Sequence, residues 1–114
     1  MPRKNEAQIL LGQHINELKI SYGMEYQFDR SRRWRADFYL IEHGILIEIE
    51  GGISKYEKFH PGWLKQRHQR ADGMLRDMEK YNTATMLGYR VLRFSTQQVL
   101  DGTARAFLKE WLCK

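Results

Sequence analysis

The sequence predicts one α/β domain in which helices flank a mixed central sheet. Three observations support this prediction. The 114 residues suffice for a single hydrophobic core, apolar residues recur at helical spacing in separate segments, and four strand-like stretches lie between those segments. The predicted order is α-β-β-β-α-β-α, and a strand that is reached through a helix is expected to pair in parallel. Residues 1–114 therefore form one domain, which excludes two-domain enzymes.

Composition narrows the possible partners and compartment. Nineteen Lys and Arg against fourteen Asp and Glu give a net charge of +5, which favours a polyanionic partner. Cys113 stands alone, so an intrachain disulfide framework and cysteine-based metal knuckles are excluded. No signal-peptide core or membrane-spanning run is present, and we expect a cytoplasmic protein.

The first half of the chain is expected to contain one helix and an antiparallel meander. Apolar residues at helical spacing predict a helix over 5–22, with Gly23 as its stop signal. Strand patterns follow at 24–28, 33–41 and 45–50. The short connection at residues 42–44 predicts a tight hairpin between the last two strands.

The second half begins with mixed signals, and we interpret residues 51–69 as a functional loop. A helix is predicted over 70–87, with Met74, Met78 and Tyr81 as its core-packing stripe and Gly88 as its C-terminal cap.

A strand at 89–94 completes the predicted sheet. The residues from Ser95 to Gln98 match a capping box that opens another helix, and the chain ends helically.

Acidic residues gather on one face of the predicted sheet. Alternation along 45–50 sends Glu48 and Glu50 to the same face, and a two-residue hairpin loop would set Asp37 opposite Glu50. Three converging carboxylates repel one another unless a cation neutralises them, and hard oxygen ligands suit Mg²⁺ or Mn²⁺. The alternative is that both glutamates lie on the solvated face of an edge strand.

Three segments together resemble the PD-(D/E)XK nuclease superfamily. They are Asp37 within residues 34–40, the Glu-Ile-Glu-Gly-Gly run within 47–52, and the Gly-Tyr-Arg-Val-Leu-Arg-Phe run within 87–94. The sequence is most similar to the branch of very-short-patch-repair endonucleases and small phage-encoded endonucleases. The resemblance implies a restriction-endonuclease-like αβββαβ core and a metal-dependent DNA endonuclease, active in repair, recombination or phage DNA processing. It also implies that the cytoplasm is that of a bacterial or phage-infected cell.

The resemblance also implies roles for individual residues. Asp37 and Glu48 would hold Mg²⁺ or Mn²⁺, with Glu50 and the Ile49 carbonyl as further ligands. Glu50 stands where the superfamily usually has a lysine that orients or deprotonates the attacking water. A carboxylate cannot supply that positive charge, so the cation must come from elsewhere.

Three residues are candidates for supporting this chemistry. Lys80 is the first candidate for the displaced cation, and its alternative role is a solvated lysine paired with Asp77 or Glu79. His68 is the second candidate, and it could equally be an exposed histidine. Glu17 on the first helix could be an outer-shell ligand through water, or an ordinary surface acid.

Basic residues near these acids predict DNA as the partner. Arg side chains bind phosphate bidentately, whereas Trp34 among them is interpreted as a core residue. The predicted DNA-binding residues form two groups: Arg30, Arg32, Arg33 and Arg35, and then Lys65, Arg67 and Arg70. The alternative for the second group is that it belongs to a solvated loop.

Two functions fit these observations. The first is a DNA endonuclease, which would need a homodimer to cleave both strands because one protomer offers one active site. The second is a DNA-binding or assembly module that kept the fold and lost catalysis, a possibility that Glu50 at the lysine position encourages.

Overall fold

A computed structural model describes residues 4–51 and 63–114, with side chains for 4–51 and 73–114. It confirms the α/β class with a mixed sheet flanked by helices. The elements in chain order are α1 (Lys4–Glu17), β1 (Tyr22–Tyr26), β2 (Ala36–Leu40), β3 (Ile45–Glu50), α2 (Trp63–Met86), β4 (Arg90–Ser95), α3 (Thr96–Leu100) and α4 (Thr103–Leu112).

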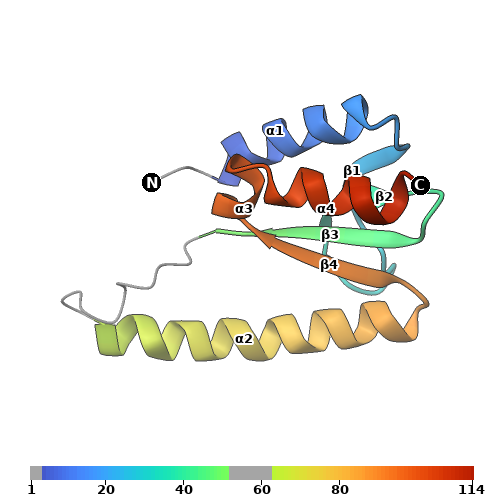
Figure 1. Cartoon of the computed structure of the whole chain (residues 1–114). Coiled ribbons are helices and arrows are strands. Elements are labelled where there is room, and N and C mark those ends of the chain that lie inside the picture. Colours follow the sequence, from blue (N-terminus) through green and yellow to red (C-terminus); the bar gives the residue numbers. More distant parts are fainter. Residues whose placement is uncertain (1–3, 52–62) are drawn as a thin grey trace.

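The four strands lie in the order β1-β2-β3-β4. The first three pair antiparallel, and β4 pairs in parallel with β3. Helix α2 carries the chain from β3 to β4 and lies along one face of the sheet (Figure 1). The predicted helical crossover to a parallel last strand is therefore confirmed.

The main core fills the space between the sheet and the layer formed by α1, α3 and α4 (Figure 1). Each large apolar side chain buried there stabilises the fold by about 1.5–3 kcal/mol. Fully buried members of this core are Leu11, Ile15, Phe38, Leu40, Ile47, Ile49, Val99 and Leu108. On the α2 face the buried cluster is smaller, and includes Leu46 and Ala84. Less apolar burial on that face leaves room for polar side chains.

Helix α1 is shorter than the predicted helix over 5–22. It ends at Glu17 because Lys19 adopts the left-handed conformation, with φ of 60°, and the chain then turns toward the sheet. Gly23, the predicted stop signal, is instead a residue of β1 paired with Tyr39. The apolar residues Leu18 and Ile20 still pack into the core, which explains why they extended the helical pattern.

Helix α2 is longer than predicted, because it begins at Trp63 and takes in residues that we assigned to a loop. Gly88 follows the helix with φ of 97°, as a C-terminal glycine should. The predicted core stripe is wrong for two of its three members: Met74 is 57% exposed and Met78 is 52% exposed, whereas Tyr81 is half-buried. The small apolar area on this face of the sheet accounts for the difference.

The hairpin between β2 and β3 has a four-residue connection rather than the two-residue loop assumed for the register. Leu40 pairs with Ile45 and Phe38 with Ile47. The Leu40 carbonyl accepts from the N–H groups of His43 and Gly44, and Gly44 has φ of 64°, which glycine adopts without strain.

The C-terminal part agrees closely with the sequence patterns. Ser95 and Gln98 form the predicted capping box at the start of α3. The expected single helix is divided into two, because the chain turns at Asp101 and at Gly102, which has φ of 87°. Within residues 4–51 and 63–114, no helix has the length and apolar run required to cross a membrane.

Candidate active site

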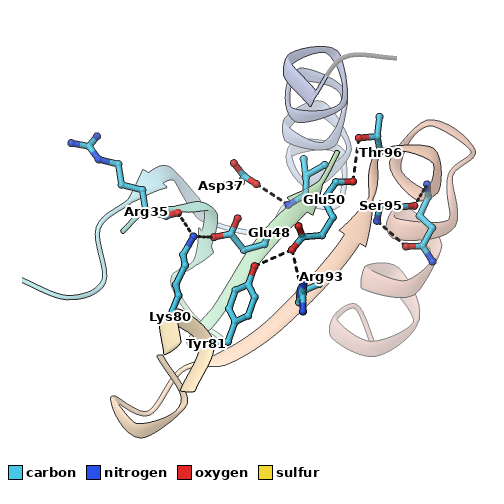
Figure 2. A network of polar contacts seen from close by, with 11 residues as sticks. Arg35, Asp37, Glu48, Glu50, Lys80, Tyr81, Arg93, Ser95 and Thr96 are labelled. Atoms are coloured by element: carbon cyan, nitrogen blue, oxygen red, sulfur yellow. Dashed lines mark hydrogen bonds and ion pairs between the residues drawn. The ribbon is translucent and has the colours of Figure 1, made fainter. Parts of the chain in front are cut away.

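The site begins where β2 separates from β3. Paired residues on these strands extend to Phe38 and Ile47, so β2 does not provide the Ile49 N–H with a backbone partner. The Asp37 carboxylate takes that place, because its Oδ2 accepts from the Ile49 N–H at 2.7 Å (Figure 2). Asp37 is only 4% exposed, so an acid is fixed in the sheet at this opening.

Glu48 lies beside this opening and is 6% exposed. The Lys80 ammonium of α2 reaches over the sheet and donates to Glu48 Oε1 (Figure 2). The same Nζ donates to the Arg35 carbonyl at 2.9 Å. Lys80 therefore connects α2, the segment before β2 and a buried acid, and the hydrogen bonds and ion pairs of the described side chains do not join it to Asp77 or Glu79.

The pKa of Glu48 is raised from 4.5 to about 7. Burial is the largest cause of this rise, and the neighbouring Asp37 charge acts in the same direction. The charges of Lys80 and Lys4 oppose this rise. Lys4 Nζ also lies 3.2 Å from Asp37 Oδ1. Two lysines thus supply positive charge to two buried carboxyl groups.

Glu50 has different partners. Its Oε1 accepts from the Tyr81 hydroxyl and from Arg93 Nε, both at 2.9 Å (Figure 2). The predicted convergence of three carboxylates is not found: in the part of the chain described, no group of three or more His, Cys, Asp or Glu side chains could hold a metal. The longer hairpin connection is the reason, because continuing its register sets Asp37 level with Glu48 rather than Glu50.

Glu17 is not brought to these acids. Lys4, at the start of α1, contacts Asp37, and Glu17 lies thirteen residues further along the helix, or about 20 Å at 1.5 Å per residue. Its Oε2 instead pairs with Arg105 Nε of α4 at 3.3 Å. The outer-shell role expected for Glu17 is therefore not supported by its position.

Four of the predicted residues belong to the first part of α2. The structure describes the backbone there, and their side chains lie outside the described residues. These residues are Lys65, Arg67, His68 and Arg70.

The predicted arginine cluster adjoins the site. Its members are exposed and line a surface hollow of about 640 Å³. They are Arg30, Arg32, Arg33 and Arg35. Lys80 binds the Arg35 carbonyl, which joins this hollow to Glu48. Trp34 is partly buried and packs on the smaller cluster, with its ring centroid 6.3 Å from that of Phe28, in agreement with its interpretation as a core residue. The guanidinium carbon of Arg32 lies 4.8 Å from the centre of the Trp34 ring.

Sequence reasoning missed three residues around the acids. Tyr81 was assigned to the core stripe, although its hydroxyl binds Glu50. Arg93 stands two residues after Val91 in a strand pattern, and its pairing with Glu48 follows only from the parallel register. Lys4 carried no signal, because its contact with Asp37 depends on how α1 packs on the sheet.

Comparisons with known proteins identify a similar fold among solved structures. No protein-family model matches the chain, and no curated protein gives a significant match. Among solved structures, the catalytic domain of the homing endonuclease I-Bth0305I matches with a TM-score of 0.60 and 19% sequence identity, over 94% of each chain. The two chains therefore share a fold along nearly their whole length.

Proposed function

We propose that this protein is a metal-dependent endonuclease that hydrolyses phosphodiester bonds in DNA. The observation that carries the proposal is the pair of buried acids, Asp37 and Glu48, at the opening between β2 and β3 with the Lys80 ammonium on Glu48. Burying two acids together is costly, and a buried carboxyl group with a raised pKa, here Glu48, marks a candidate active site.

The shared fold supports the same function. The similar solved structure is described as the catalytic domain of a homing endonuclease. A fold alone does not imply an activity, so the argument rests on the acids that this chain carries at the sheet opening.

The donor set fits a hard divalent cation such as Mg²⁺ or Mn²⁺. Asp37 and Glu48 would hold the cation, and the Ile49 carbonyl would join them, since N–H and C=O of one residue in a strand face the same neighbour and the Ile49 N–H faces Asp37. When bound, the cation supplies Lewis-acid charge at the phosphate and a more acidic water. The side chain of Lys4 is 46% exposed and could turn to solvent, where the divalent cation would replace its charge at buried Asp37.

Lys80 is proposed to replace the lysine that Glu50 displaces. Its ammonium opposes the rise that burial causes in the pKa of Glu48, and from this place it can donate a proton or positive charge to the reacting phosphate. His68 is the second candidate for the same task. DNA would approach over the hollow formed by Arg30, Arg32, Arg33 and Arg35, whose guanidinium groups suit backbone phosphates.

A second candidate function is a DNA-binding or assembly module without catalysis. The observation in its favour is that protein cations already neutralise both acids, Lys4 at Asp37 and Lys80 at Glu48. Such a module would bind DNA without requiring a metal. A metal titration and a cleavage assay on one preparation separate the two functions.

The test is a gel assay of branched, mismatched and linear DNA duplexes with Mn²⁺, Mg²⁺ or EDTA. We expect cleavage of at least one substrate with a divalent metal, none with EDTA, and ends that carry 5′-phosphate and 3′-hydroxyl groups. The substrate that is cut fastest would point to repair, recombination or phage DNA processing. Binding of all three substrates without cleavage under any metal would favour the non-catalytic module.

A further inference from the structure

Arg93 lies on the strand next to the buried acid pair but forms its hydrogen bond with Glu50. In the parallel ladder between β3 and β4, Arg93 pairs with Glu48. Paired residues of neighbouring strands project to the same face, so Arg93 projects toward α2 beside the buried acid. Its side chain is 49% exposed, which leaves its end accessible to a large ligand.

Two neighbours hold the Arg93 side chain in one orientation. Its Nε donates to Glu50 Oε1 at 2.9 Å, and its guanidinium carbon lies 4.5 Å from the centre of the Tyr81 ring. The Tyr81 hydroxyl donates to the same Glu50 oxygen at 2.9 Å, so the three groups form a closed set (Figure 2). Partial burial acts to lower the pKa of Arg93, but the hydrogen bond and charge of Glu50 outweigh it and raise this pKa.

This arrangement leaves the outer part of the guanidinium available. A guanidinium has five N–H donors, and the Glu50 contact uses the one on Nε. No hydrogen bond joins its two terminal nitrogens to the residues described by the structure. Four N–H donors on a fixed plane match the geometry of a phosphate, which arginine binds bidentately.

We infer that Arg93 binds a DNA backbone phosphate next to the Asp37–Glu48 pair, and that Glu50 and Tyr81 are positioning residues that hold its guanidinium. The inference rests on the proposed function and gives Glu50 a task other than metal binding. It also explains why an acid can stand at this place, since an acid orients an arginine where a lysine would repel it.

Arg105 offers a matched control. Its Nε also donates to a glutamate, Glu17, at 3.3 Å, and its side chain is 36% exposed. It lies on α4, in the helix layer on the other face of the sheet (Figure 1). Arg93→Gln and Arg105→Gln therefore remove the same charge and the same kind of ion pair from opposite faces.

The experiment measures the affinity of the full chain for a short labelled duplex at several salt concentrations, with EDTA present to prevent cleavage. At about 0.1 M salt we expect Arg93→Gln to weaken binding about tenfold and to reduce the slope of log affinity against log salt by about 1, with Arg105→Gln equal to wild type. Arg93→Lys should keep the slope, because the charge remains, but bind more weakly than wild type.

Equal losses in Arg93→Gln and Arg105→Gln, or no loss in either, would overturn the inference and leave the proposed function standing. If Arg93→Gln fails to fold, Arg93→Lys decides: wild-type affinity in that variant contradicts a bidentate contact. Failure of the wild-type chain to bind DNA at any salt concentration would overturn the proposed function and this inference together.

Discussion

The Lys80 ammonium, which donates to Glu48, is the group proposed to supply the missing positive charge in the cleavage reaction. If Lys80 supplies the missing cation, Lys80→Met should lower the cleavage rate by about 10² to 10⁴, the range for a lost proton-transfer or electrostatic contribution, with DNA affinity nearly unchanged. Single-turnover cleavage and equilibrium binding measure the two quantities. Lys109→Met, an exposed lysine of α4, is the control for charge. Full activity of Lys80→Met with an inactive His68→Ala would move the role to His68.

The metal-binding proposal separates Asp37 from Glu50. Calorimetric titration with Mn²⁺ should show a site in the wild type that Asp37→Asn abolishes. Glu50→Gln should retain it, because a glutamine oxygen can still accept from Tyr81 and Arg93. Loss of Mn²⁺ binding in Glu50→Gln would show that Glu50 turns toward the metal and is a ligand.

Glu48 should make the stability of the metal-free protein depend on pH. Its pKa is about 7 in the folded state against 4.5 ordinarily, so the folded state binds more protons between these values and stability falls as pH rises through this window. The loss is at most on the order of 3 kcal/mol. Urea unfolding in EDTA from pH 4.5 to 8 should show this fall in wild type and a weaker one in Glu48→Gln. Identical pH profiles would contradict the assignment.

At the scale of elements, the two faces of the sheet differ in what they contribute to stability. Leu11→Ala in α1 should cost about 2–5 kcal/mol, because it opens a cavity in the main core, whereas Met78→Ala in α2 should change the free energy of unfolding by about 0.5 kcal/mol or less. Urea denaturation measures both. A large loss in Met78→Ala would mean that its side chain is buried in solution.

The same difference explains which elements could be predicted from sequence. Strands β3 and β4 and the capping box at Ser95 were predicted closely, because local patterns determine them. The start of α2 could not be placed, because Gly and Pro signals before it suggested a loop. Helical spacing of Met74 and Met78 also showed nothing about whether the sheet face beneath them is apolar.

For the whole molecule, the order of elements was enough to predict a mixed sheet with a parallel last strand, since connection lengths restrict the topology. The contacts of the candidate active site were harder to predict from the sequence. Period-two alternation placed Glu48 and Glu50 on one face of the sheet, but the partner of Asp37 depended on a hairpin connection that is two residues longer than assumed. The contacts of Lys4, Lys80 and Arg93 join distant segments, and no local pattern encodes them.

The most direct measurement of the central claim is nicking of a supercoiled plasmid by the full chain and two variants, each with Mn²⁺ and with EDTA. The buried acid pair predicts that the wild type and Glu110→Gln, which changes an exposed acid of α4, nick the plasmid only with Mn²⁺. Asp37→Asn should be inactive while retaining its fold by circular dichroism. Equal nicking by Asp37→Asn and wild type, or nicking that persists in EDTA, would contradict a metal-dependent nuclease site at Asp37 and Glu48.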